Sequence, residues 1–295
     1  MTKSVLLVTN PLSGHGRGSA ASVVAAARLR QRGAEVAEVS GATAAESVRL
    51  VRDRLSGGHR PDAVVCAGGD GLVCVVLQAL AGIGVPLGLV PGGTGNDLAR
   101  ELGVPQEDPI AAADIVLNGS ARSIDLGEVQ GPVRFATVAG TGFDARVALR
   151  ANRMRYPRGP LRYTVAALAE LARGLAVPYR IELDDSAVVE TEAIMVAVGN
   201  TRSYGGGMLI CPDAVVDDGL LDLTVVGAMS RREMLRMLPA LSSGRRIDHP
   251  AVRQYRAAEI TLTAPGAPVT ADGDPAGALP ARFRALPGVQ AVIVP

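Results

Sequence analysis

The chain has 295 residues, of which 48% are hydrophobic, 20% are charged and 3% are aromatic, and its formal net charge is +1. This length accommodates two domains with a core built from Ala, Val and Leu, and the charge balance argues against nucleic acid as the main partner. Because Lys3 is the only lysine, the lysine-dependent phosphate sites of P-loop proteins and protein kinases are excluded.

The cysteines and the apolar runs indicate the compartment. Cys66, Cys74 and Cys211 lie in apolar surroundings without the spacing of a metal site, which is typical of buried thiols in a reducing environment. The first apolar run is too short for a signal peptide, and the longest one, at 63–96, is interrupted by Gly, Pro and Asp70. We therefore expect a cytoplasmic protein without a transmembrane helix.

Strand-like and helix-like patterns alternate through the first part of the chain. Short apolar runs predict strands at 4–10, 34–39, 62–67 and 85–91. Helical apolar spacing predicts helices at 19–33, 43–55, 71–82 and 96–104. Thr43 and Glu46 have the spacing of a capping box. Because strands that alternate with helices form right-handed βαβ units, we expect an α/β domain with a mostly parallel sheet at 1–126.

The pattern changes after this point. Strand-like runs separated by Gly, Pro and Asp occur at 133–140, 178–185, 190–200, 220–227, 257–264, 267–273 and 289–294. Helical spacing is confined to 144–155, 161–174 and 231–242. We expect a β-rich second domain at 127–295, built as an antiparallel sheet or sandwich that carries some helices.

Three loops in the first domain are rich in glycine and small hydroxyl residues. They occupy 9–18, 67–72 and 91–97, and each follows a predicted strand. Glycine allows backbone to approach a phosphate closely, and a helix N-terminus supplies N–H donors with a partial positive charge. Because the carboxyl ends of parallel strands meet at one edge of a sheet, the three loops predict a phosphate site there.

Asp70 is the only charged residue between Asp62 and Asp97. A carboxylate beside a phosphate needs a divalent cation between the two groups, so Asp70 and Asp97 suit a magnesium network linked to a nucleotide. The alternative is that both residues cap helices. For Asp97 the two interpretations are nearly balanced, whereas the Gly-Gly-Asp-Gly setting of Asp70 favours a functional role.

These motifs also resemble those of a known family. "NPLSG" at 10–14, "GGDG" at 68–71 and "PGGTGNDLAR" at 91–100 look like the diacylglycerol kinase catalytic-domain family, and in particular its bacterial lipid kinases related to sphingosine and ceramide kinases. The resemblance continues with the segments at 138–147, 217–226 and 271–275 and the C-terminal "LPGVQAVIVP". It implies an α/β nucleotide domain, a β-rich second domain and an ATP site in the cleft between them.

The resemblance also implies roles for individual residues. Asp70 and Asp97 would join a magnesium network, and Asp218 would bind a structural Mg²⁺ together with the backbone carbonyls of Val215 and Leu220. Asp272, in "ADGDP", would be the general base that takes a proton from a lipid hydroxyl, although the residues alone favour a tight turn. ATP would be held by Asn10, Pro11, Leu12, Ser13, Gly14, Gly68, Gly69, Asp70, Gly71, Gly93, Thr94, Asn96 and Asp97.

Four positions depart from the family pattern. Leu72 stands where the family usually has Thr, and Cys74 and Val75 replace an Asn-Glu pair. Asp274 is a shorter carboxylate than the usual Glu. These changes leave the degree of activity open, so a non-catalytic nucleotide- or lipid-binding protein that keeps the kinase fold stays an alternative.

The leading hypothesis is an ATP- and Mg²⁺-dependent kinase that phosphorylates a hydroxyl of a diacylglycerol-like or sphingoid lipid. A kinase of the NAD kinase type is a further alternative, which the motifs at 91–97 and 271–275 fit poorly. Arginines interleaved with apolar residues at 145–171 form a face for anionic lipid at the inner membrane surface, or else a solvated helix face. The sequence does not indicate which lipid is the acceptor, whether ATP or GTP is the phosphate donor, or whether the chain forms a homodimer.

Overall fold

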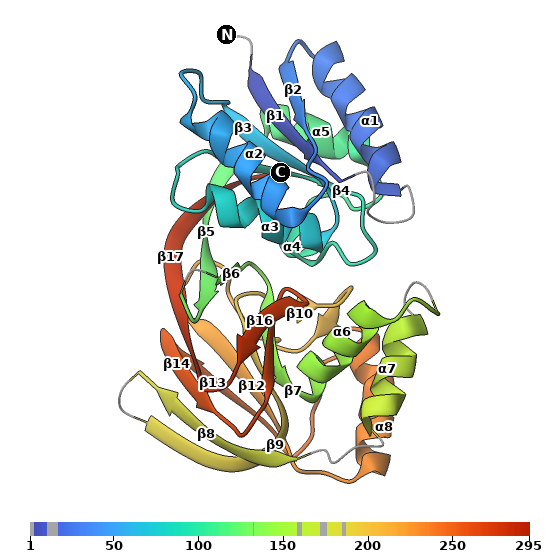
Figure 1. Ribbon diagram of the computed structural model, residues 1–295, viewed down its shortest axis with the longest axis vertical. Helices are drawn as coiled ribbons and strands as arrows, with labels where there is room; N and C mark the ends of the chain where they lie inside the picture. Colours follow the sequence, from blue (N-terminus) through green and yellow to red (C-terminus); the bar gives the residue numbers. More distant parts are fainter. Residues whose placement is uncertain (1–2, 11–16, 132, 158–160, 172–175, 185–186) are drawn as a thin grey trace. The chain divides into compact units, whose positions relative to one another are not determined.

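The computed structural model describes residues 3–10, 17–131, 133–157, 161–171, 176–184 and 187–295 (Figure 1). The chain forms two compact units. Unit 1 consists of Met1–Leu126 together with Pro287–Pro295, and unit 2 consists of Gly127–Leu286. The second unit thus begins after Leu126, and the end of the last strand returns to unit 1.

The sheet of unit 1 is parallel, as expected from the alternating pattern. Its strands are β2 (Glu35–Val39), β1 (Ser4–Thr9), β3 (Ala63–Gly68) and β4 (Leu87–Pro91), hydrogen-bonded in that order. The final strand, β17 (Ala281–Val294), adds beside β4 in parallel through Val292 opposite Leu87. All residues of β3 and β4 are buried, as parallel strands covered on both faces require.

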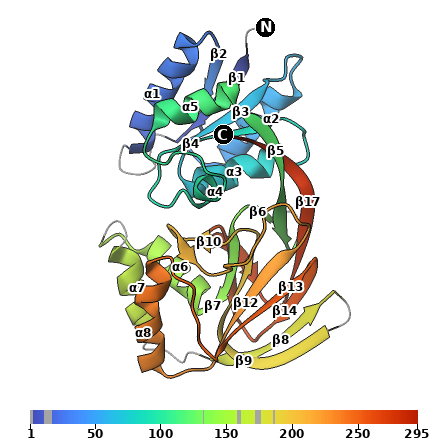
Figure 2. The same cartoon turned by 180° about the vertical axis from the view of Figure 1, so that it is seen from behind.

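Helices cover both faces of this sheet. Helices α1 (Arg17–Gln31) and α5 (Pro109–Asn118) pack together on one face, and α2 (Ala44–Ser56) and α3 (Asp70–Leu80) on the other (Figures 1 and 2). The Thr43 hydroxyl accepts from the Glu46 N–H at 3.1 Å, and the Glu46 carboxylate accepts from the Ala42 N–H. The predicted helix start is therefore confirmed. Helix α5 was not predicted, although Asp108 caps it and Pro109 begins it.

Unit 2 is built from antiparallel strands, as expected. The long strand β9 (Ala187–Gly199) pairs with β8 (Val177–Leu183), β7 (Val138–Gly142) and β12 (Leu221–Gly227). The remaining strands are β6 (Val133–Phe135), β13 (Val252–Ala257), β14 (Glu259–Thr263), β15 (Pro268–Ala271), β16 (Asp274–Ala278) and the small hairpin of β10 (Ser203–Tyr204) and β11 (Met208–Leu209). Strand β5 (Ser120–Val129) begins in unit 1 and ends in unit 2. Strands β5 and β13 were not predicted, and β17 begins at Ala281 rather than near residue 289.

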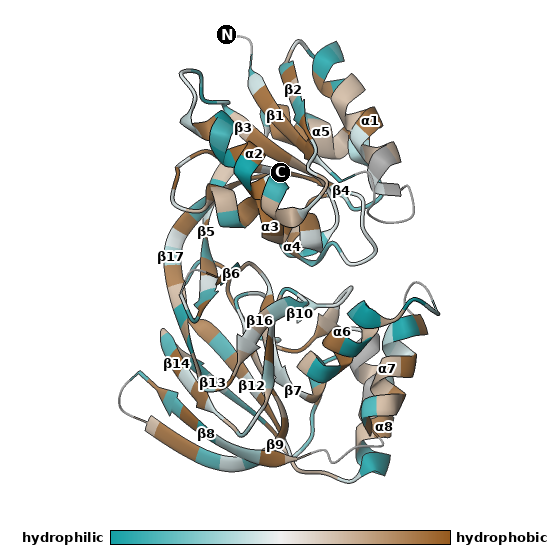
Figure 3. Cartoon of the chain, viewed as in Figure 1, coloured by the Kyte–Doolittle hydropathy of each residue, from teal (hydrophilic) through white to brown (hydrophobic). Residues whose placement is uncertain are grey.

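Two apolar clusters hold unit 2 together. One contains Phe135, Tyr179 and Phe283 between the strands. The other joins helices α6 (Phe143–Arg153), α7 (Leu161–Leu171) and α8 (Arg231–Ser242) to the sheet through residues such as Phe143 and Met234. In Figure 3 both the strands of unit 2 and the helices α6 and α7 carry brown and teal residues. In the helices this mixture is typical of elements that bury one face only.

Candidate functional site

Glycines bring the predicted loops of unit 1 into direct contact. The Gly92 N–H donates to the Gly68 carbonyl at 2.9 Å. A Cβ atom on Gly93 would lie 2.6 Å from the Gly69 Cα, and one on Gly92 would lie 2.9 Å from the Gly18 Cα. Backbone therefore packs on backbone at the carboxyl ends of β1, β3 and β4, and no side chain fits between the loops. The second and third loops meet each other and Gly18, at the start of α1, at one sheet edge, as the parallel order predicts.

Part of the first loop is not described. Pro11, Leu12, Ser13 and Gly14, which the resemblance implies as ATP contacts, lie outside the described residues. Asn10 is described and partly buried just after β1. The predicted site is therefore visible through its second and third loops.

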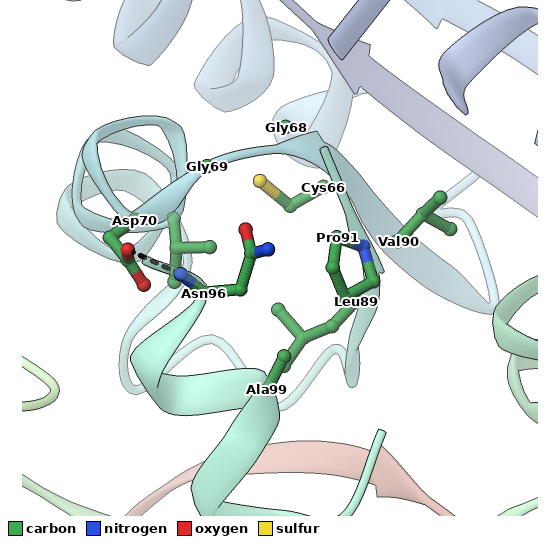
Figure 4. Close-up of a pocket in the computed structure, with 10 residues that line it drawn as sticks. Cys66, Gly68, Gly69, Asp70, Leu89, Val90, Pro91, Asn96 and Ala99 are labelled. Atoms are coloured by element: carbon green, nitrogen blue, oxygen red, sulfur yellow. Dashed lines mark hydrogen bonds between the residues drawn. The ribbon is translucent and has the colours of Figure 1, made fainter. Parts of the chain in front are cut away.

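Asp70 links the second loop to the third. Its Oδ2 accepts from the Asn96 N–H at 2.7 Å (Figure 4), and its Oδ1 accepts from the Asp97 N–H at the same distance. Asn96 has a left-handed conformation with φ 52°, and its side-chain amide bonds both the N–H and the carbonyl of Gly93. Asp70 lies at the start of its own helix α3 but caps the start of α4 (Asp97–Glu101). A capping role is thus present at Asp70, and it fixes the shape of the 91–97 loop.

Asp97 is held by an ion pair. Its Oδ1 lies 2.6 Å from Arg100 Nη1, and its side chain is 5% exposed. The same guanidinium donates to the Gly95 carbonyl at 2.9 Å and to Gln106. Both carboxylates of the predicted magnesium network therefore have partners within unit 1. Since a carboxylate oxygen has two lone pairs, each can still accept a further bond.

A small cavity lies beneath the two loops. Cys66, Gly68, Leu89 and Asn96 are among its lining residues, and Figure 4 shows the Cys66 thiol and the Asn96 amide pointing into it. Its volume of about 10 Å³ admits a single water molecule. Burial raises the pKa of the Cys66 thiol, which keeps it protonated and unreactive. The cavity is therefore too small to admit a nucleotide.

On the outer side of the loops Gly71 and Thr94 are exposed. Leu72, which departs from the family pattern, is buried beneath the second loop. Its side chain packs so closely on Gly68 that a Cβ atom added there would lie 2.9 Å from the Leu72 Cδ2. Cys74 is also buried, and Val75 is half-buried on α3. These substitutions place apolar groups at the start of α3, beneath the second loop. Gly71 in the second loop and Thr94 in the third loop remain exposed.

Asp272 occupies a tight hairpin turn in unit 2. Asp272 and Gly273 have φ values of 49° and 84°, which form a two-residue turn of type I′ between β15 and β16. The Asp272 carboxylate accepts from the N–H groups of Ala136 and Thr137 at 2.9 Å each and from the Thr137 hydroxyl at 2.6 Å. Burial raises the pKa of Asp272, against the opposing effect of these hydrogen bonds. The tight-turn interpretation of "ADGDP" is therefore confirmed.

Asp274 presents a second carboxylate beside this turn. It begins β16 opposite Ala271 and is exposed. Desolvation raises the pKa of Asp274 as well. Among the residues that the structure describes, none donates a hydrogen bond to its carboxylate, whereas Asp272 has three donors.

Asp144, to which no sequence motif assigns a role, forms a further acidic site. Asp144 is the second residue of α6, and its Oδ1 accepts from the Tyr204 hydroxyl at 2.7 Å. Burial raises the pKa of Asp144 to about 6. The only signal in the sequence is its place in the family-like segment at 138–147, which does not indicate its partner 60 residues away.

Asp218, the expected ligand of a structural Mg²⁺, is paired with an arginine. Its Oδ1 accepts from the Leu220 N–H at 3.1 Å, and its Oδ2 contacts Arg256 Nη2. Val215 is exposed. Within the described ranges, no group of three or more His, Cys, Asp or Glu side chains is arranged to hold a metal ion. The implied set needs only one carboxylate and two backbone carbonyls, so the deciding observation is the Arg256 guanidinium on Asp218 Oδ2. This positive group occupies the place of a cation, and the side chains around Asp218 therefore do not fit the implied metal site.

Comparison with known proteins identifies the family. Residues 4–129 match the model of the "Diacylglycerol kinase catalytic domain", and residues 137–294 match that of the "YegS C-terminal NAD kinase beta sandwich-like domain". The chain belongs to the diacylglycerol kinase catalytic-domain family. The resemblance and the expected fold class are thereby confirmed.

Relatives in this family match the chain along nearly its full length. "Diacylglycerol kinase" of Mycobacterium tuberculosis H37Rv is 46% identical, with 99% of this chain and 95% of the relative covered. "Probable lipid kinase YegS-like" of Pseudomonas aeruginosa PAO1 is 34% identical, with 99% and 94% covered. The crystal structure of a putative diacylglycerol kinase from Bacillus anthracis Sterne shares the fold, with a TM-score of 0.79, 24% identity and coverage of 99% and 97%.

No helix in the described part of the chain is both long and apolar enough to span a membrane.

Proposed function

We propose that this member of the diacylglycerol kinase family is an ATP-dependent kinase that phosphorylates a hydroxyl of a diacylglycerol-like or sphingoid lipid. One observation supports the proposal most directly. In unit 1, glycine-rich loops contact one another through their backbones at the carboxyl ends of the parallel strands. The names of the relatives, diacylglycerol kinase and lipid kinase, support the lipid as acceptor.

The triphosphate binds on the outer side of these loops. The first N–H groups of α3, an eleven-residue helix, and the exposed Gly71 and Thr94 are suitable donors. Asn96 and Asp97 act by shaping the loop, because Asp70 already binds their N–H groups. The complete proposed set is Asn10, Pro11, Leu12, Ser13, Gly14, Gly68, Gly69, Asp70, Gly71, Gly93, Thr94, Asn96 and Asp97.

Mg²⁺ enters with the nucleotide. Of the two carboxylates, Asp70 is the better candidate to bind water molecules of the ion's hydration shell. Asp97 is less suitable because it is buried and paired with Arg100. When bound, the ion offsets negative charge on the transferred phosphoryl group. No step is assigned to a metal at Asp218, where the donors do not fit.

Two carboxylates compete for the role of general base. The lipid O–H gives its proton to the base, its oxygen bonds to the γ-phosphorus, and the bond from that phosphorus to the leaving ADP oxygen breaks. Asp272 is our first candidate, and burial raises its pKa, which strengthens it as a base. Asp274 is favoured as a second candidate by its free carboxylate. In this scheme unit 1, which contains 1–126, is the nucleotide domain, and unit 2, which contains the predicted second domain from 127 up to Leu286, is the lipid-substrate domain.

Helices α6 and α7 provide a surface for an anionic membrane. Tyr156, Leu161 and Leu168 are between 53% and 72% exposed, and Arg153 and Arg155 are exposed beside them in the sequence. Apolar side chains with neighbouring arginines suit the headgroup region of anionic lipid. We propose that this surface, residues 153–157 and 161–168, brings the enzyme to the inner face of the cytoplasmic membrane.

The surface is smaller than the sequence predicts. Arg146 and Arg150 instead pair with Glu170, whose side chain is 4% exposed, at 3.4 and 2.6 Å. These two arginines therefore join α6 to α7. Arg158 lies outside the described residues.

Lipid-dependent ADP release tests the function. Mg²⁺–ATP is supplied with micelles of diacylglycerol, monoacylglycerol, ceramide, sphingosine or phosphatidylglycerol, and NAD serves as a soluble control. The proposal expects ADP release with one of the lipids. ATP binding without release in any arm would favour the binding-protein alternative, and release with NAD would favour the NAD kinase alternative.

A further inference from the structure

The ion pair between Asp218 and Arg256 results from the register of two antiparallel strands. In the antiparallel pairing of β12 and β13, Arg256 lies directly opposite Asp222. Its Nε is 3.3 Å from Asp222 Oδ2, and its Nη2 contacts Asp218 Oδ2. One guanidinium therefore bridges a strand residue and the loop that precedes the strand.

The loop around Asp218 is also held by an internal hydrogen bond and by a second ion pair nearer its start. Asp218 Oδ1 accepts from the Leu220 N–H, and Gly219 between them has φ 78°, so the loop makes a tight turn there. Farther back, Arg246 binds both oxygens of Asp213 at 2.9 and 2.7 Å. Two arginines, from β13 and from the segment after α8, thus anchor the stretch that the resemblance assigns to a metal.

We propose that Arg256 takes the place of the structural Mg²⁺ in this chain and holds the Asp218 loop without a metal. Magnesium requires a near-octahedral set of oxygen ligands, whereas Asp218, which supplies the only side chain of the implied set, is held by the Leu220 N–H and by a positively charged guanidinium. A divalent ion bound at Oδ2 would also lie against the guanidinium and be repelled by it. Asp222 is only 10% exposed, so loss of the guanidinium would leave two carboxylates close together and partly desolvated.

The test is thermal unfolding of the full chain without nucleotide, in EDTA and in excess MgCl₂. The wild-type Tm is expected to be the same in both to within about 1 °C, and Arg256→Gln should lower it by about 2–4 °C. Arg253→Gln is the matched control, because Arg253 is an exposed arginine on the same strand, opposite Val225, and its Tm should stay at the wild-type value. In a double-mutant cycle with Asp218→Asn, the two losses should not add.

Two results would overturn the proposal. One is a wild-type Tm that rises in MgCl₂, with the rise lost in Asp218→Asn. The other is an Arg256→Gln variant that unfolds at the same temperature as Arg253→Gln. If Arg256→Gln does not fold, titration of Mg²⁺ into nucleotide-free wild type decides: absence of stoichiometric binding supports the proposal, and binding that Asp218→Asn abolishes contradicts it. Because no nucleotide or lipid is used, the outcome is independent of the proposed kinase activity.

Discussion

Asp70 and Asn96 lie 26 residues apart and are joined by a 2.7 Å hydrogen bond from the Asn96 N–H to the Asp70 carboxylate. The other oxygen of Asp70 binds the next N–H along the chain, that of Asp97. One carboxylate thus fixes the start of α4 and, through Asn96, the loop around Gly93. This arrangement explains why a single charged residue interrupts the most apolar segment of the chain: it orders a loop that the apolar residues around it cannot.

Asp70→Asn should reduce both stability and ATP binding. The amide keeps one acceptor oxygen, but its NH₂ group would face a backbone N–H, so one of the two bonds is lost at a cost of about 1–2 kcal/mol. We expect a lower Tm and a smaller upward shift of Tm on addition of Mg²⁺–ATP.

Asp108→Asn is the matched control for this variant. Asp108 also caps a helix of unit 1 by accepting from two N–H groups, but it uses one oxygen, Oδ1, for both. Asparagine retains that oxygen, so stability and the ATP-induced shift should stay close to wild type. Equal behaviour of the two variants would refute a specific role for Asp70 at the nucleotide site.

The choice of general base is resolved by Asp272→Asn and Asp274→Asn. Loss of a general base typically slows turnover by about 10²–10⁴-fold. If Asp272 is the base, its variant loses turnover and Asp274→Asn keeps most of it; the reverse pattern assigns the role to Asp274. Because Asp272 also orders the backbone at Ala136 and Thr137, Tm must be measured for each variant. Full turnover in both would contradict a carboxylate base at this hairpin.

Asp144 should make the protein less stable as the pH rises from about 4 to 6. Its pKa is about 6 in the folded chain against 3.8 as the ordinary value, so the folded state holds the proton more tightly over this range. The stabilisation is complete below pH 4 and is lost as the pH passes 6. Asp144→Asn removes the ionisation while keeping an acceptor for Tyr204.

The expected result for Asp144→Asn is a free energy of unfolding higher than wild type at pH 7.5 by at most about 3 kcal/mol, and equal to it at pH 4. Denaturant unfolding at the two pH values measures this. If the variant were destabilised equally at both pH values, ionisation of the Asp144 carboxyl would not lower the free energy of unfolding, and the prediction would be wrong.

The proposed membrane surface at 153–157 and 161–168 predicts that binding to vesicles depends on anionic lipid. The double variant Arg153→Gln with Arg155→Gln should pellet several-fold less with vesicles that contain phosphatidylglycerol, because each arginine near the surface contributes about 1 kcal/mol. Arg49→Gln with Arg54→Gln is the control: both arginines are exposed on α2 of unit 1. Equal loss with the two double variants would point to a diffuse charge effect and contradict a specific surface.

The sequence predicted the parts of the fold that depend on local patterns. The parallel sheet of unit 1 followed from continuous apolar runs such as 62–67, and the capping box at Thr43 marked a helix start that the structure retains. Helix α5 was missed although Asp108 and Pro109 form a standard start signal. Strand β5 was missed because its first four residues are exposed and carry no apolar alternation.

Contacts between distant residues could not be predicted. No local rule pairs Arg256 with Asp218 or Tyr204 with Asp144, since each pairing depends on the register of an antiparallel sheet or on a hairpin. The same holds for Asp70: its spacing indicated a special role, but only the structure shows that it caps another helix. The roles implied for Asp272 and for the nucleotide-binding residues between Asn10 and Asp97 stay predictions. The metal role implied for Asp218 is the one that we propose the ion pair with Arg256 replaces.

Transfer of label from [γ-³²P]ATP to lipid tests the central claim most directly. The wild-type chain, Asp272→Asn and Asp274→Asn are incubated with Mg²⁺ and diacylglycerol or sphingosine micelles, and label is counted after extraction into organic solvent. The account predicts label in one extracted lipid, with a loss of about 10²–10⁴-fold in one of the two variants. Label that remains entirely in the aqueous phase with every lipid, from protein that binds ATP, would contradict a lipid kinase.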